Sequence, residues 1–391
     1  MARMVLNETS YFGAGCRKEL IPELKKRGVG KAFIVSDNDL VKFNVVKMVT
    51  DVLDQAKVTY SIFSDVKANP TITNVKNAIA AFKAFNPDVI IAIGGGSCID
   101  TAKAVGIIVN NPEFADVKSL EGVADTKNKA FPTICFATTS GTAAEVTINY
   151  VITDEEAGRK LVCVDPNDIP MIAFNDAEMM MSMPKGLTAA TGMDALTHAI
   201  EGYITLAANP ITDLLCWNSI KFIAENLRDA VKDGSDAKAR EFMAYGSYVA
   251  GMAFSNVGLG IVHSMAHPLG ARFDVPHGVA NALLLPYVME YNKPAALKKY
   301  ADIARAMGVD VKGMTDDEAA TAAIDAVKKL AADINIPKTI KELKKKGTDE
   351  VLIKKEDLIT LAKDAFIDPC TGGNPRKTSE EEILAIYNIA Y

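Results

Sequence analysis

Apolar segments alternate with helical patterns along the first half of the chain, and this alternation restricts the possible folds most. The clearest apolar segments are KAFIVSD at residues 31–37 and VIIAI at residues 89–93, and helix-spaced valines and leucines over residues 39–56 follow the first. Strands that are apolar along their whole length are buried on both faces, and helices supply the crossovers that parallel strands need. We therefore expect an α/β domain with a parallel sheet over residues 1–183. Further strand patterns lie at residues 58–66, 131–138, 146–153, 160–164 and 171–174, with another helical pattern at residues 73–85.

The second half of the chain has a different pattern. Strand patterns fade near Met183, and long helical patterns such as residues 316–332 take their place. Ser379 and Glu382 have the spacing of a capping box before a last helical pattern at residues 383–391. A chain of 391 residues is also long for a single hydrophobic core. We expect a domain boundary near residue 183 and an all-α domain over residues 184–391.

Charge and cysteine spacing exclude several classes of protein. The net charge of −6 argues against a nucleic-acid partner, because a phosphate backbone requires clustered Lys and Arg. No apolar run approaches the ~18–20 residues that cross a bilayer, and Asn7 and Glu8 lie where a signal peptide would be apolar. The six cysteines are scattered without CxxC spacing, as in proteins with reduced thiols. We expect a cytoplasmic protein with no nucleic-acid or membrane partner.

Three polar segments in the first half are candidates for dinucleotide binding. GGGSCID at residues 94–100 follows an apolar strand pattern and precedes a helical one. Its glycines let the backbone approach a ligand closely, and the N-terminus of the next helix offers free amides to a pyrophosphate. An ordinary glycine turn without a ligand is the alternative. Asp37 ends another strand pattern. An acid at this place can bind the ribose of NAD and repel the extra phosphate of NADP. The alternative is that Asp37 only caps the helix that follows. TTSGT at residues 138–142 offers hydroxyls to a phosphate or carboxamide, or forms a turn without a ligand.

All four histidines of the chain lie within residues 198–277. Asp194 and His198 are four residues apart, as are His263 and His267, so each pair lies on one helix face, and His277 follows. Any one of these histidines could be an ordinary core residue. One carboxylate with two or three imidazoles, however, suits a divalent transition metal. Beside a nicotinamide, such a Lewis acid would support hydride transfer at a carbonyl carbon.

Several longer motifs resemble those of the iron-containing (group III) alcohol dehydrogenases. They are GGGSCID, GLGIVHSMAHPLGARFDVPHG at residues 258–278, FNDAEMM, DALTHAIEGY and CTGGNPR, and the resemblance covers essentially the whole chain. It implies a fold like that of dehydroquinate synthase, with an α/β dinucleotide-binding domain and an all-α metal-binding domain. It also implies NAD, Fe(II) with Zn(II) as the alternative ion, and a homodimer in which an N-terminal strand at residues 4–9 pairs across subunits.

The same resemblance implies roles for individual residues. The metal ligands would be Asp194, His198, His263 and His277, while His267 would lie beside the metal without binding it and act at the substrate and nicotinamide. Phe254 and Cys370 would line the substrate pocket. Cys98 departs from the proline that is common in the family's glycine loop, so we expect altered loop stiffness, retained binding, and a thiol open to oxidation if it is exposed. The dinucleotide would contact Asp37, Asn69, Gly95, Gly96, Ser97, Asp100, Thr138, Thr139, Thr142, Asn149 and Lys160.

The expected activity is hydride transfer between NAD(H) and a short-chain alcohol or aldehyde. NPTIT, NNPEFADVKSLEG and AAEVTINYVITDEE resemble family members that interconvert lactaldehyde and 1,2-propanediol. The alternatives are a glycerol dehydrogenase and an NAD- and metal-dependent lyase of the same fold. A phosphate-bearing lyase substrate would need clustered cations near the metal, and residues 190–203 and 258–281 contain only Arg272. A non-enzymatic sensor of NAD or metal is the alternative from another class.

Overall fold

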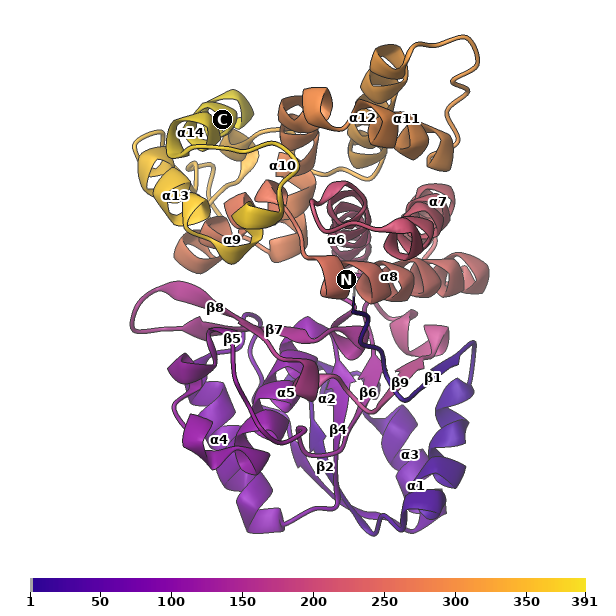
Figure 1. The fold of residues 1–391 in the computed structure, drawn as a ribbon. Coiled ribbons are helices and arrows are strands. Elements are labelled where there is room, and N and C mark those ends of the chain that lie inside the picture. Colours follow the sequence, from indigo (N-terminus) through magenta and orange to yellow (C-terminus); the bar gives the residue numbers. More distant parts are fainter. Residues whose placement is uncertain (1–2) are drawn as a thin grey trace. The chain divides into compact units, whose positions relative to one another are not determined.

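The structure is a computed structural model in which residues 3–391 are described. Contacts divide these residues into two compact units, 3–183 and 184–391. The first unit is an α/β unit and the second consists of helices (Figure 1). The predicted fold class is therefore confirmed, and each unit is described by itself below.

The first unit is built on a six-stranded parallel sheet with the order β1-β9-β6-β4-β2-β3. Strand β3 lies on one side of β2 and β4 on the other, so the chain changes direction in the sheet at β2. In such sheets ligands bind at the carboxyl ends of the strands where the order reverses. The strands are β1 (Thr9–Phe12), β2 (Lys31–Val35), β3 (Thr59–Phe63), β4 (Val89–Gly94), β6 (Thr133–Ala137) and β9 (Ile172–Asn175).

Side chains alternate between two buried faces of this sheet, as continuous apolar strands require. On β2, Ala32 and Ile34 belong to the core under the first helices, whereas Phe33 and Val35 belong to the core under the later ones. Helices α1 and α3 cover one face, and α4 and α5 cover the other (Figure 1). The helices of this unit are α1 (Leu20–Arg27), α2 (Asn38–Lys42), α3 (Lys47–Ala56), α4 (Ile72–Phe85) and α5 (Gly96–Asn110).

The structure corrects one sequence-based expectation in this unit and adds detail to two others. The helix expected over residues 39–56 is two helices, because Asn44 adopts a left-handed conformation with φ of 60° between α2 and α3. The segments at residues 146–153 and 160–164 form a separate sheet, in which β7 (Asn149–Asp154) pairs antiparallel with β8 (Arg159–Val164) and β8 pairs with β5 (Gly122–Val123). At the N-terminus, the strand begins at Thr9 and pairs with β9 of its own chain, so pairing of residues 4–9 across subunits stays a prediction.

The second unit is all-helical, with helix α6 packed against α7, α8 and α10. The capping box at Ser379 and Glu382 is present, because the Ser379 side chain accepts from the Glu382 amide and the Glu382 side chain accepts from the Ser379 amide. The helices are α6 (Lys185–Ile204), α7 (Pro210–Lys232), α8 (Ala237–Val257), α9 (Ile261–Phe273), α10 (His277–Asn292), α11 (Leu297–Ala306), α12 (Asp316–Asp333), α13 (Asp357–Phe366) and α14 (Glu380–Ala390).

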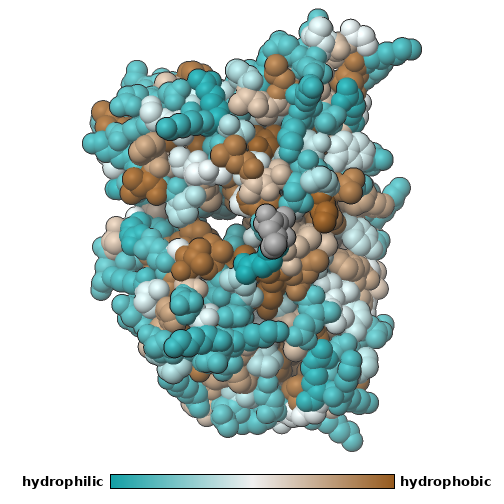
Figure 2. All heavy atoms as spheres, in the orientation of Figure 1, coloured by the Kyte–Doolittle hydropathy of each residue, from teal (hydrophilic) through white to brown (hydrophobic). Residues whose placement is uncertain are grey.

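The long apolar helices α8 and α9 pack in the core of the second unit. Within residues 3–391 no single helix is long and apolar enough to cross a membrane; α8 and α9 together meet the criterion by length and composition, but they are bent by 103°. Most of the apolar side chains of both helices are buried in the core of the second unit. In the view of Figure 2, hydrophilic side chains cover most of the visible surface of the first unit, whose central strands β2, β4, β6 and β9 are buried.

Candidate metal centre and cofactor loops

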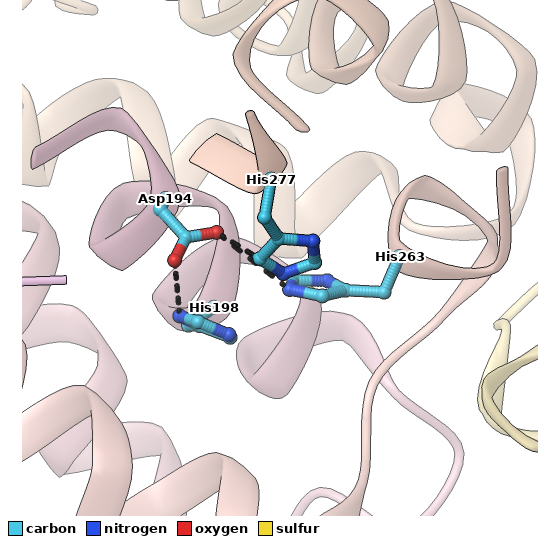
Figure 3. Close-up of side chains that lie close together, drawn as sticks. All are labelled: Asp194, His198, His263 and His277. Carbon is cyan, nitrogen blue, oxygen red and sulfur yellow. Dashed lines mark ion pairs between the residues drawn. The ribbon is translucent and has the colours of Figure 1, made fainter. Parts of the chain in front are cut away.

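Four side chains of the helical unit converge on one point. Asp194 and His198 come from α6, His263 from α9 and His277 from the first turn of α10. One ligand atom from each lies within 4.8 Å of the others, and Figure 3 shows the Asp194 carboxylate directed at all three rings. Donors that share one tetrahedral ion with bonds of about 2.0–2.1 Å lie about 3.3–3.4 Å apart, so small side-chain movements would close the group around an ion. The structure thus brings together the four predicted ligands.

Close backbone packing sets the position of His277. A Cβ added at Gly278 would lie 2.3 Å from the Ala190 carbonyl oxygen of α6, so only glycine permits this approach of the two helices. The approach places the N-terminus of α10 beside the turn of α6 that carries Asp194. His277 Nε2 then lies 3.7 Å from Asp194 Oδ1, and His263 Nε2 lies 3.9 Å from the same oxygen.

A buried carboxylate orients the His263 ring. Glu201 Oε2 lies 2.6 Å from His263 Nδ1, while Glu201 Oε1 accepts the Val262 amide at 2.7 Å. A carboxylate at Nδ1 keeps the proton on that nitrogen and directs the lone pair of Nε2 towards the other donors. Burial lowers the pKa of His263 to about 3, and it raises the pKa of Glu201 to about 7. His263 is therefore a neutral imidazole near pH 7, which is the form that binds metals.

An amide completes the surroundings of the four donors. Asn281 is fully buried on α10, one turn after His277, and its Nδ2 donates to Asp194 Oδ1 at 2.7 Å. The same nitrogen lies 3.1 Å from Nε2 of both His263 and His277. Asn281 therefore fixes the Asp194 carboxylate relative to two of the rings.

His267 lies next to the four donors and has a carboxylate partner of its own. Its ring is stacked on that of His277 with centroids 5.5 Å apart, and its Nδ1 lies 2.7 Å from Asp368 Oδ2. Asp368 immediately precedes a short helix at Pro369–Gly373 and also accepts the Cys370 amide at 2.9 Å. His267, Asp368 and Cys370 form a second group whose ligand atoms lie within 4.8 Å of one another.

An aromatic ring lies against the other side of the cluster. Phe254 of α8 is buried and stacked on His198, with centroids 4.2 Å apart and planes inclined by 11°. The His198 ring is thus held between Phe254 and His263, whose centroid is 4.5 Å from its own. The structure therefore places Phe254 and Cys370, the two predicted pocket residues, next to the predicted metal ligands or to His267.

In the first unit, the glycine segment and the threonine segment form one surface. Gly94 ends β4 opposite Ala137, the last residue of β6, so the loops that follow begin at the same level of the sheet. A Cβ at Gly95 would lie 3.1 Å from the Thr139 side chain, and one at Gly96 would lie 2.8 Å from that of Thr142. Thr138 donates its amide to the Gly94 carbonyl oxygen at 3.0 Å. Ser97 is in the first turn of α5, whose free amides also point to this region.

Asp37 has the capping role that the sequence left open. Its Oδ1 accepts the Leu40 amide at 2.8 Å at the start of α2, and its Oδ2 lies 3.6 Å from the Cys98 sulfur. The second contact shows that the loop after β2 touches the glycine segment after β4. Cys98 is 1% exposed, and burial with the nearby Asp37 charge raises the pKa of its thiol, so the condition for an oxidation site is not met.

The remaining predicted residues connect α5 with the small sheet. Lys160 Nζ donates to Asn69 Oδ1 at 3.1 Å, and Asn69 adopts a left-handed conformation with φ of 55°. Asp100 Oδ2 accepts the Val151 amide at 3.0 Å. The fully buried Lys103 donates to the carbonyl oxygens of Thr147 and Asn149 at 2.6 and 2.9 Å. These bonds attach the strand that carries Asn149 to the helix that follows the glycine segment.

Sequence reasoning missed four of these residues. Glu201 could have been found, because it follows Asp194 by seven residues and so lies on the same helix face. Asn281 follows His277 by four residues and Lys103 follows Asp100 by three, which are also same-face spacings. Asp368 has no such signal, since it pairs with a histidine 101 residues away in the chain.

The chemistry of the four donors fits a divalent transition metal. Asp194 offers a hard oxygen and the three histidines offer borderline nitrogens, a set that binds Fe(II) or Zn(II) and contains no thiolate. His263 is neutral and correctly oriented without a metal, and the other partners described above hold Asp194 and His198 in place. A bound ion would act as a Lewis acid towards a carbonyl oxygen.

Comparison with known proteins assigns both units to the same protein family. Residues 7–177 match the family described as iron-containing alcohol dehydrogenase, and residues 188–391 match the C-terminal part of the Fe-containing alcohol dehydrogenase family. Lactaldehyde reductase of Escherichia coli strain K12 is 54% identical over 389 residues, covering 100% of this chain and 99% of the relative. Solved structures of a 1,3-propanediol oxidoreductase and of an alcohol dehydrogenase from Oenococcus oeni each superpose with a TM-score of 0.95 at 40% identity, with full coverage of both chains.

Proposed function

Because the chain belongs to the iron-containing alcohol dehydrogenase family, we propose that it interconverts lactaldehyde and 1,2-propanediol with NAD(H) and Fe(II). The observation that carries this proposal is the convergence of one aspartate and three histidines in a chain that resembles a lactaldehyde reductase along its whole length. The enzyme is an oxidoreductase of this family; its physiological substrate and its cofactor are the proposed part.

The proposal assigns the dinucleotide to residues 1–183. Gly95, Gly96, Ser97 and the threonines of residues 138–142 would hold the pyrophosphate, because glycine backbone, hydroxyls and the α5 N-terminus meet there. Asp37 would bind the adenosine ribose with Oδ2 while Oδ1 keeps capping α2, so the capping role does not conflict with the proposed ribose contact. Asn69, Asp100, Asn149 and Lys160 would border the cofactor from the side of the small sheet.

The proposal assigns the metal to residues 184–391, with Asp194, His198, His263 and His277 as its ligands. When bound, Fe(II) supplies Lewis-acid polarisation of the aldehyde oxygen, and NADH supplies the hydride. Glu201 would keep the Nε2 lone pair of His263 directed at the ion, and Asn281 would orient Asp194.

His267 would handle the proton of the reaction. Asp368 accepts from its Nδ1, which leaves Nε2 to give a proton to the alkoxide oxygen during reduction and to take it back during oxidation. A histidine suits this role because its ordinary pKa is near ~6.5. Asp368 is then a positioning residue, since it acts through His267.

Phe254 and Cys370 would limit the substrate to a small molecule. The Phe254 ring is fixed against His198, so it would fill space next to the metal and leave room for short carbon chains. We also keep the expectations of a homodimer and of a cytoplasmic location, which rest on the sequence arguments above.

The test is a substrate panel on anaerobically purified, iron-loaded protein. Lactaldehyde, glyceraldehyde, dihydroxyacetone, 3-hydroxypropanal and benzaldehyde are each supplied with NADH, and NADH oxidation is followed by absorbance. The proposal expects the highest kcat/KM with lactaldehyde and none above background in His263→Ala. The highest kcat/KM with dihydroxyacetone would favour a glycerol dehydrogenase, and no oxidation with any of these substrates would favour a lyase or a non-enzymatic protein.

A further inference from the structure

The group of His267, Asp368 and Cys370 has the composition of a metal site in its own right. A ring nitrogen, a carboxylate oxygen and a sulfur lie within 4.8 Å of one another, and none of the three residues is among the four donors of the first cluster. Asp368 and Cys370 come from one short segment, on either side of Pro369, and the third residue comes from α9. His267 is buried, whereas Asp368 and Cys370 are half-buried and so keep some exposure to solvent.

The donor types differ from those of the first cluster in one decisive respect. The first cluster has no sulfur, whereas this group adds a thiol to an imidazole and a carboxylate. Sulfur, nitrogen and carboxylate oxygen are the three donor types that bind zinc in proteins, and three protein ligands with a fourth position left for water are common. Donors around one zinc ion with bonds of about 2.0–2.3 Å lie about 3.3–3.8 Å apart, which these side chains reach by small rotations.

We propose that His267, Asp368 and Cys370 form a second metal site, which takes a thiophilic divalent cation such as Zn(II). The cation takes the place of the hydrogen atom between His267 Nδ1 and Asp368 Oδ2, which now lie 2.7 Å apart. Asp368 is suited to this because its other oxygen is already anchored by the Cys370 amide and the Ser264 hydroxyl. The carboxylate thus stays in place when the hydrogen bond is lost.

The protons balance without any redox step. The Cys370 thiol loses its proton to solvent when sulfur binds the cation, and the ring proton of His267 moves from Nδ1 to Nε2, so the imidazole stays neutral. Burial and the charge of Asp368 raise the pKa of Cys370, so that the thiol is protonated near pH 7 until a cation is present. A coordinating thiol is deprotonated outright by the metal. Binding of the cation therefore releases one proton, that of the Cys370 thiol.

Occupation of the second site would inhibit the enzyme, and this consequence rests on the proposed function. The cation would bind His267, which could then no longer exchange a proton with the alcohol oxygen. It would also bind Cys370, which is a proposed residue of the substrate pocket. Inhibition would need no loss of iron from the first cluster, which distinguishes it from replacement of one metal by another.

Anaerobic titration of the iron-loaded protein with Co(II) tests the site directly. A cobalt–thiolate bond gives a charge-transfer absorption in the near ultraviolet, and the first cluster cannot produce it because it has no sulfur donor. We expect the band in wild type and in Cys16→Ser, a control whose cysteine is likewise half-buried but belongs to the first unit. We expect no band in Cys370→Ser, which should still retain iron and give an unchanged circular dichroism spectrum.

A second measurement follows NADH oxidation while Zn(II) is added to the iron-loaded enzyme. The expected result is inhibition of wild type that a chelator reverses while the iron content stays constant, with Cys370→Ser resistant to the same zinc concentration. Absence of the cobalt band in wild type, or its persistence in Cys370→Ser, would overturn the second site. Failure of the proposed function is distinguishable, because it would remove lactaldehyde reduction and leave the cobalt band intact.

Discussion

Replacing Glu201 by glutamine tests whether a carboxylate outside the ligand set controls the metal centre. Glu201 is 2% exposed and uses both oxygens as acceptors, one for His263 Nδ1 at 2.6 Å and one for the Val262 amide at 2.7 Å. Glutamine has almost the same shape but only one acceptor oxygen, so its NH₂ group must face one of these two donors. If it faces the ring, it favours the tautomer whose proton is on Nε2, and that proton blocks the lone pair that would bind the ion.

The expected fall in iron affinity follows from the loss of this hydrogen bond to His263. Removing a hydrogen-bonding partner of a ligand histidine lowers metal affinity by about 10- to 100-fold, or roughly 1.4–2.7 kcal/mol. The assay is anaerobic competition for Fe(II) between the protein and a coloured chelator. The matched control is Asp368→Asn, which changes the same kind of bond at His267 and should lower the rate without weakening iron binding. Iron affinity equal to that of wild type in Glu201→Gln would refute the reasoning.

Three further substitutions give separate readouts. Asp37→Gly should raise activity with NADPH and lower affinity for NADH, and because glycine is itself tolerated at an N-cap, loss of the α2 cap should cost only about 0.3 kcal/mol of unfolding free energy; an unchanged cofactor preference would mean that Asp37 is only a cap. His267→Ala should keep the iron content of wild type and lose rate, so a loss of iron would make His267 a ligand. Phe254→Ala should admit longer and aromatic alcohols in a substrate panel, whereas unchanged selectivity would remove Phe254 from the pocket.

The sequence predicted the central strands of the main sheet because they are apolar on both faces, as parallel strands covered by helices on either side must be. It did not predict the break near Asn44, because the apolar spacing continues across a single residue in a left-handed conformation. The strand patterns at residues 146–153 and 160–164 were found, but the sequence left open whether they extend the main sheet or flank it. Strand β7 of the small sheet is buried on alternate residues, and the hydrogen bonds from Lys103 and Asp100 that attach it to α5 leave no local pattern.

The candidate metal site was easier to predict than its surroundings. Histidines are rare in this chain, so their spacing was conspicuous, and the family resemblance then implied which of them bind the metal. The close contact between α6 and α10 at Gly278, which positions His277, was not predicted. Glu201 and Asn281 share helix faces with predicted ligands, but glutamate and asparagine are common at such positions in any helix. Asp368 could not be found at all, because its partner is far away in the sequence and only the fold brings the two together.

The Asp194 and histidine cluster should make hydride transfer depend on a metal, with iron as the active ion. The donor set has no thiolate, and divalent zinc should bind at least as tightly as Fe(II), so affinity alone does not decide which ion works. The most direct measurement strips the metal and restores a single equivalent of Fe(II) or Zn(II) without air. NADH oxidation by lactaldehyde is then followed in each sample. We predict no activity in the stripped protein, full activity with Fe(II) that is lost in air and regained with Fe(II) and a reductant, and poor activity with Zn(II). Full, air-stable activity with zinc would contradict the iron assignment, and full activity in the metal-free protein would contradict the metal-dependent mechanism itself.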